Sequence, residues 1–191
     1  MTNVLTRFWT AGALAGFLFL GACAASEPML ESKHPTPPGN VDLSGQWQLR
    51  ETGDARRRPK VDNNIEIPTR AASRQRVAQP RPKVSSVHLF LEYGTDVKVT
   101  QTPYSMFISY DRAIVEEYTF GENRLISVGP IEAKRVSGWN GESFVVETLD
   151  RERSTLYETW SLRSPNVLQR DVRIVEREEE VFRLQQLFDR G

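Results

Sequence analysis

The sequence predicts a mainly β protein, an antiparallel meander of about 8–10 strands that curls into a barrel or a half-barrel. Three observations lead to this prediction. After Asp96 the chain is a succession of short segments in which apolar and polar residues alternate, which is the period of a strand with one buried face. Turn residues separate these segments, among them Gly129-Pro130 and Ser164-Pro165-Asn166. Asn140-Gly141 is the dipeptide most typical of a tight β-hairpin.

The N-terminal residues have the order of a secretory signal peptide: a basic residue, Arg7, then an apolar run from Ala11 to Leu20, then small residues. Leu20-Gly21-Ala22-Cys23 resembles the bacterial lipobox, in which cleavage precedes the cysteine and a diacylglycerol is attached to its thiol. The resemblance implies a signal peptide over residues 1–22 and a covalent lipid, of the palmitate type, on Cys23.

Two other interpretations of this segment stay open. A retained transmembrane anchor would need roughly 20 apolar residues, whereas this apolar core has about ten. An ordinary signal peptide followed by an incidental cysteine is the second alternative. Cys23 is the only cysteine in the sequence, so an intramolecular disulfide cannot form in the exported chain.

The residue after the cysteine, Ala24, bears on location. In Gram-negative lipoproteins an aspartate at this position usually means retention in the inner membrane. The resemblance therefore implies a lipid anchor in the outer membrane, with the protein facing the periplasm. Cleavage would leave 169 of the 191 residues, which is enough for one domain with a core.

We expect a Pro-rich tether over residues 23–40 and a single β-barrel domain over residues 41–191, because the stretch around Pro35-Thr36-Pro37-Pro38 cannot build a core. The domain begins with a strand from Val41 to Leu49. Its alternate residues share one face and include Trp47, which we expect to be a core residue or a ligand contact at one end of the barrel.

A basic excursion follows over residues 50–83. It holds ten basic and four acidic residues, a net charge of +6, and many prolines. We expect it to contact an anionic surface through exposed cations, the candidates being Arg56, Arg57, Arg58, Lys60, Arg74 and Arg76. One or two short helices are expected between the first and second strands, a basic one over 69–79 and another over 84–93. The second of these segments also fits a strand.

The remaining strands follow at nearly regular spacing. Each is bounded by turn residues and shows a period of two or a richness in β-branched and aromatic residues. They are expected over residues 97–101, 104–110, 113–120, 125–128, 131–139, 144–149, 154–162, 167–176 and 181–188.

The hairpin of the 154–162 and 167–176 strands predicts one interior contact. If Leu162 lies opposite Leu168, then Trp160 lies opposite Arg170 and Glu158 lies diagonal to it on the apolar face. A buried arginine needs partners, and the Trp160 ring and the Glu158 carboxylate can supply them. The alternative is a register shifted by one residue, which turns Arg170 to solvent.

Several short motifs resemble those of a known group of proteins. Gly45-Gln46-Trp47 at the start of the first strand is similar to the Gly-x-Trp signature of calycin-type barrels. The chain more closely resembles uncharacterised lipocalin-like lipoproteins of proteobacteria, through the motif segments at residues 43–47, 138–141, 158–162 and 188–190. The resemblance implies a lipocalin-like barrel and an envelope location, and no known reaction.

The sequence contains no Gly-x-Ser-x-Gly, no phosphate-binding glycine loop and no metal-ligand spacing around either histidine. We therefore expect a non-catalytic binding or scaffold module without a metal and with no cofactor beyond the lipid on Cys23. Its partner would be a small apolar ligand or an envelope protein, besides the membrane itself. The nearly neutral mature chain gives no reason to expect nucleic acid. The alternatives are an inhibitor or accessory subunit of an envelope enzyme or assembly machine, and a hydrolase with an unrecognised site.

Overall fold

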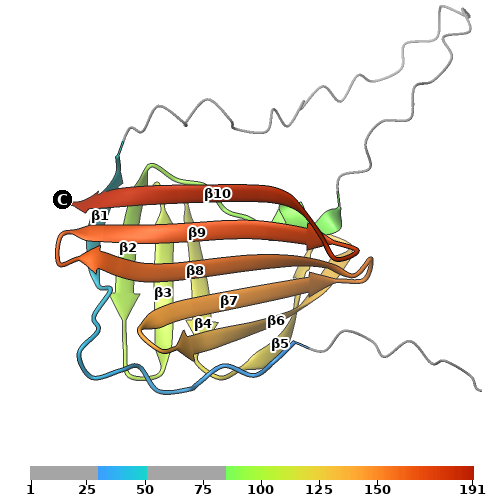
Figure 1. Cartoon of the computed structure of the whole chain (residues 1–191), viewed down its shortest axis with the longest axis horizontal. Helices are drawn as coiled ribbons and strands as arrows, with labels where there is room; N and C mark the ends of the chain where they lie inside the picture. The colour runs from blue at the N-terminus through green and yellow to red at the C-terminus, as the bar shows by residue number, and fades with distance from the viewer. Residues whose placement is uncertain (1–29, 51–84) are drawn as a thin grey trace, which may run out of the picture.

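The computed structural model describes residues 30–50 and 85–191, and these form one antiparallel sheet that curls into a half-barrel (Figure 1). The sheet has ten strands, and a single turn of 3₁₀ helix, η1, covers one end. The elements are β1 (Gly45–Leu49), η1 (Ser86–Phe90), β2 (Asp96–Gln101), β3 (Ser105–Tyr110), β4 (Ile114–Thr119), β5 (Asn123–Val128), β6 (Ile131–Asn140), β7 (Ser143–Asp150), β8 (Ser154–Ser164), β9 (Val167–Glu176) and β10 (Glu179–Arg190).

The predicted fold class is confirmed. The strand order is β4-β3-β2-β1-β10-β9-β8-β7-β6-β5. Consecutive strands therefore pair from β1 to β4 and from β5 to β10, and β1 joins the two halves of the meander by pairing with both β2 and β10. β4 and β5 are left as the two edges of the sheet. Of the expected helices, the one over residues 84–93 is present as η1, and the one over 69–79 lies outside the described residues. Within the described part of the chain, no helix is long and apolar enough to cross a membrane.

The hairpin between β6 and β7 forms where the sequence predicts it, with its turn displaced by one residue. Asn140 pairs with Ser143 as the last rung of the ladder, so the two turn residues are Gly141 and Glu142. Gly141 takes the first of these positions with φ of 57°, a left-handed conformation that glycine adopts without steric cost.

Two apolar clusters fill the inside of the half-barrel. The larger cluster lies between β2–β4 and β7–β10 around Trp47, Phe144, Trp160 and Phe188, and in Figure 1 β8–β10 pass in front of β2–β4. The smaller cluster lies beneath η1, where Val87 and Phe90 contact Leu156, Val172 and Ile174.

Trp47 belongs to the larger cluster as a core residue near the C-terminal end of β10. Its Nε1 donates to the carbonyl of Leu43 at 3.0 Å, and the guanidinium of Arg190 lies 4.2 Å from the ring centroid. Gly45 allows this contact, because a Cβ there would lie 2.7 Å from Nη1 of Arg190. The glycine and the tryptophan of the Gly-x-Trp motif thus have linked structural roles.

Residues 30–40, expected to be part of a tether, pack against the barrel wall. His34 and Trp139 exchange backbone hydrogen bonds of 3.0 and 2.9 Å, and Nζ of Lys33 lies 2.7 Å from Glu147. The segment passes so close to β6 that a Cβ on Gly138 would lie 2.7 Å from the His34 carbonyl oxygen. This part of the chain is therefore attached to β6 and β7 rather than extended away from the domain.

Candidate functional site

A layer of polar side chains separates the two apolar clusters. Four strands contribute to it in the same way, each placing one buried polar residue between a residue of the smaller cluster and a residue of the larger cluster. These residues are Arg135 of β6, Glu158 of β8, Arg170 of β9 and Gln186 of β10. On β8, for example, Glu158 lies between Leu156 and Trp160 on the inward face. The layer therefore crosses the interior of the half-barrel.

Arg170 lies at the centre of the layer and is fully buried. The strand register predicted from the sequence is confirmed, because Trp160 pairs with Arg170 and Leu162 pairs with Leu168. Nε of Arg170 donates to Glu158 Oε2 at 3.1 Å, Nη2 donates to the same oxygen, and the guanidinium carbon lies 4.9 Å from the Trp160 ring centroid.

Two further hydrogen bonds use Nη1 of Arg170. It donates to Oε1 of Gln186 at 3.2 Å and to the main-chain carbonyl of Glu92 at 2.9 Å. The second bond fixes the segment that connects η1 to β2, and so it holds Glu92 beside the layer.

Arg135 is the second buried cation. Its Nε donates to Oγ1 of Thr148 at 3.0 Å and its Nη1 donates to Oε2 of Glu116 at 2.8 Å. The guanidinium lies 5.5 Å from the ring centroid of Tyr118 and 6.0 Å from that of Phe90. The guanidinium of Arg135 is therefore held by a hydroxyl, a carboxylate and two aromatic rings.

Two buried polar atoms in or beside the layer have no hydrogen-bond partner among residues 30–50 and 85–191: the hydroxyl of Tyr110 and Nε1 of Trp160. Burial raises the pKa of Tyr110, Arg170 lowers it by a smaller amount, and the carboxylates of Glu158, Glu116 and Glu92 add to the increase. The Tyr110 hydroxyl is therefore protonated and lies within the field of the same carboxylates that form the layer.

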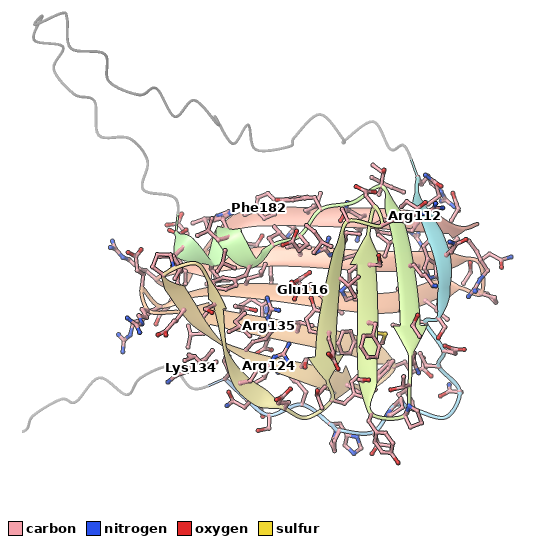
Figure 2. All side chains as sticks on the ribbon, turned by 180° about the vertical axis from the view of Figure 1, so that it is seen from behind. Arg112, Glu116, Arg124, Lys134, Arg135 and Phe182 are labelled. Atoms are coloured by element: carbon pink, nitrogen blue, oxygen red, sulfur yellow. The ribbon has the colours of Figure 1, made fainter. Side chains whose placement is uncertain are left out.

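The layer reaches the surface between β4 and β5. A pocket of about 320 Å³ opens there. Apolar side chains from η1 and β5 and the charged residues Glu92, Glu116, Arg124 and Arg135 line it. Figure 2, turned by 180° from Figure 1, shows Glu116, Arg124 and Arg135 together in the space between β4 and β5. The gap between the two edges, with this pocket, is called the seam below.

Hydrogen bonds close the seam at one end, and its other end is open. Nη2 of Arg124 donates to the Glu117 carbonyl at 2.5 Å, and Oγ of Ser137 donates to the Thr119 carbonyl at 2.8 Å. These bonds tie β5 and β6 to the last part of β4. Towards η1 the strands diverge and Leu89, Phe90 and Glu92 border the opening.

The candidate residues named from the sequence fall into three groups. Glu158, Trp160 and Arg170 meet in the layer, whereas Trp47 is a structural residue with Arg190 over its ring. Cys23 and the basic candidates of the excursion lie outside the described residues, namely Arg56, Arg57, Arg58, Lys60, Arg74 and Arg76.

Sequence reasoning missed Glu92, Tyr110, Glu116 and Arg135. Arg135 had a signal, because the alternation of β6 places it on the same inward face as Ala133 and Trp139. Glu92 had none, since it follows η1 in an irregular segment.

No protein-family model matches this chain, and no curated protein is significantly similar to it. Among the described residues, no three His, Cys, Asp or Glu side chains are grouped so that they could hold a metal ion.

Proposed function

We propose that the protein is a non-catalytic binding module, lipid-anchored at the periplasmic face of the outer membrane, that binds an extended segment of an envelope protein at the seam. One observation carries the proposal. The two edges of the sheet, β4 and β5, are each paired on one side only, and they border a single opening. An unpaired strand edge presents main-chain donors and acceptors that another extended chain satisfies.

The orientation of the backbone in β4 supports this mode of binding. The Glu117 carbonyl points towards β5, where Arg124 donates to it. Main-chain groups alternate along a strand, so those of Val115 also point into the seam. Val115 lies at the wide end, and a third strand can pair there with β4 without displacing β3.

The side chains around the opening also suit a protein partner. Four apolar residues of β4 and β5 are between 40% and 63% exposed: Ile114, Val115, Leu125 and Val128. Apolar side chains gathered at a free edge are typical of a surface that another chain covers. This favours an envelope protein over a small apolar ligand inside the barrel, where Trp47, Phe144, Trp160 and Phe188 already fill the larger cluster.

Site-specific photo-crosslinking in the native host tests the proposal. A benzoylphenylalanine at Leu125, in the full chain, should form an adduct with one envelope protein, and the attachment should map to a single segment of that protein. The same probe at Asn166, in the turn between β8 and β9, is the control position. Equal adducts from both positions would contradict a site at the seam.

A second pair of variants tests the strand edge itself. Val115→Pro removes a main-chain N–H that points into the seam, at an edge where proline is tolerated. Val115→Thr keeps that N–H. The adduct from Leu125 should be lost with proline and kept with threonine. If proline leaves it unchanged, the partner does not pair with β4. The identity of the captured protein decides between a scaffold role and that of an inhibitor or accessory subunit.

A further inference from the structure

Three backbone segments meet at the closed end of the seam. They are the connection between β4 and β5 (residues 120–122), the second half of β6, and residues 33–35 of the N-terminal segment, which is blue in Figure 1 and is called the strap below. In the connection, Gly121 donates its N–H to the Ser137 carbonyl of β6 at 2.7 Å. Because β4 ends and β5 begins at this connection, its position on β6 affects the separation of the two edges.

The strap fits against the other two segments with no spare room. His34 exchanges main-chain hydrogen bonds of 3.0 and 2.9 Å with Trp139 of β6. A Cβ on Gly138 would lie 2.7 Å from the His34 oxygen and 3.1 Å from the Gly121 nitrogen, and a Cβ on Gly121 would lie 2.8 Å from that of Pro35. Since neither glycine could carry one more carbon atom without a shift, the strap, the connection and β6 cannot move independently.

The N-terminal segment is attached on both sides of the strap and is stiff between the two attachments. Nζ of Lys33 lies 2.7 Å from Oε1 of Glu147 on β7, and these side chains are only 11% and 15% exposed. Nδ2 of Asn40 donates to Oε1 of Glu142 in the turn between β6 and β7 at 2.8 Å. Three of the residues between these attachments are prolines, whose φ angle is fixed. The strap therefore holds a fixed position against the connection.

We propose that Lys33, His34 and Pro35 are positioning residues of the binding site, because they hold the connection against β6 and thereby set the separation of the two edges. This inference rests on the proposed function, since the separation matters to a partner only if an extended segment binds there. A paired strand needs a fixed spacing of about 4.8 Å to its neighbour, so a seam of variable width binds a segment less tightly. The strap also continues towards Cys23, so the same residues connect the proposed anchor with the proposed site.

A charge swap tests the strap without changing the seam itself. Lys33→Glu places a second carboxylate beside Glu147 and should detach the strap, whereas Lys33→Glu combined with Glu147→Lys restores an ion pair. Lys98→Glu is the control, because it makes the same charge change at an exposed position on β2. His34→Pro is an independent way to detach the strap, since it removes the N–H that bonds to the Trp139 carbonyl. Faster hydrogen exchange of the Trp139 amide identifies a detached strap.

The distance between two spin labels measures the width of the seam and needs no partner. The labels are attached to cysteines that replace Val115 and Ser127, both exposed, in the full chain carrying Cys23→Ser. The chain with the native strap should give one narrow distance distribution. Lys33→Glu and His34→Pro should broaden it at least twofold, while the charge swap and Lys98→Glu should keep it narrow. An unchanged distribution in both variants, with the strap shown to be detached, would overturn the inference.

Photo-crosslinking from Leu125 in the native host, with Cys23 intact, relates the strap to binding. The adduct should fall at least fivefold in Lys33→Glu and return in the charge swap. The melting temperature of each variant is measured beside it. An adduct that follows the melting temperature rather than the width of the seam would show a merely structural role and overturn the inference.

The same experiment separates this inference from the proposed function. A wild-type adduct that persists unchanged in both detached variants would overturn the positioning role and leave binding at the seam standing. Absence of any adduct from the wild-type chain would contradict the proposed function, and the inference with it, even if the spin-label distances respond to the strap.

Discussion

At the scale of single residues, the most consequential contact is the buried pair of Arg170 and Glu158. Removing two charges from water is costly, and the pair is tolerated because Glu158, Gln186 and the Glu92 carbonyl accept hydrogen bonds from the guanidinium. The pair therefore fixes the register of β8 and β9, because a shift by one residue would expose one charge and bury another without a partner.

Truncation of the buried arginine is expected to destabilise the fold strongly. Arg170→Ala leaves Glu158 charged and buried, which should cost on the order of 3–5 kcal/mol in unfolding free energy. Arg173→Ala, on the outer face of the same strand, removes only a contact with the Tyr157 ring and should cost about 0.5–1 kcal/mol. Urea denaturation measures both values, and two equally mild substitutions would contradict the buried pair.

The double variant Arg170→Met with Glu158→Leu is the matched control. It replaces both charges by apolar side chains and should recover most of the stability that Arg170→Ala loses, because no unpaired charge remains. A double variant as unstable as Arg170→Ala would mean that packing, rather than charge, explains the loss.

Glu92 gives the fold a pH dependence of its own. Its pKa is raised in the folded protein, first by burial and then by Glu116 and Glu158, with Arg170 and Arg135 opposing and the Tyr110 hydroxyl also nearby. The folded chain holds this proton to a higher pH than the unfolded chain does. The contribution of Glu92 to the free energy of unfolding is therefore lost as pH rises. The loss begins near the pKa of Glu92 in the unfolded chain, about 4.3, and is complete above its raised pKa in the folded chain.

The comparison of wild type with Glu92→Gln isolates this effect. The two proteins should differ least at acidic pH, where Glu92 is neutral in both states, and the Gln variant should become relatively more stable as pH rises towards 7. Chemical denaturation between pH 4 and pH 7 gives the difference, in which the other titrating groups largely cancel. A difference independent of pH would mean that Glu92 titrates normally.

At the scale of elements, the positions of the strands could be predicted from the sequence, but which strands form the edges of the sheet could not. Alternation places Trp160 inward and turn residues bound each segment, so the 154–162 and 167–176 predictions differ little from β8 and β9. The curvature of the sheet decides which strands lack a partner. No local sequence pattern in β4 or β5 indicates this curvature. For the same reason the approach of residues 30–40 to β6 was missed: His34 and Trp139 are distant in sequence and pair through backbone atoms.

Gly138 is the residue that permits the contact between residues 30–40 and β6. Its φ is 154°, and a Cβ there would meet two backbone atoms, the His34 oxygen at 2.7 Å and the Gly121 nitrogen at 3.1 Å. Gly138→Ala should displace the segment and cost about 1–3 kcal/mol. Tryptic cleavage after Lys33 should become faster. Gly39→Ala, where a Cβ meets no atom within 4 Å, should leave the cleavage rate unchanged.

At the scale of the whole molecule, the basic excursion is expected to add a second, electrostatic attachment to the anchor. Full-length chain carrying Cys23→Ser should bind anionic vesicles more tightly than neutral ones, and less so as salt rises, because the Debye length falls to about 8 Å at physiological salt. Replacing Arg56, Arg57 and Arg58 by glutamine should weaken binding. The same charge change at the exposed Arg112, Arg163 and Arg177 should weaken vesicle binding less. Equal binding to anionic and neutral vesicles would rule out a contact between the basic excursion and an anionic surface.

A lipid on Cys23 would hold the half-barrel and its seam at the membrane surface. Between Ala24 and Asn40 the sequence has no apolar run that could hold a bilayer, so we expect membrane attachment to depend on the Cys23 thiol. The wild-type protein should fractionate with the outer membrane, and Cys23→Ser should be released into the soluble fraction. Ala24→Asp keeps the thiol and should move the protein to the inner membrane, which separates sorting from lipidation. A Cys23→Ser protein that still sediments with the outer membrane would contradict the lipid anchor. Any crosslinked adduct at Leu125 would then have formed on a protein held at the membrane by another part of the chain.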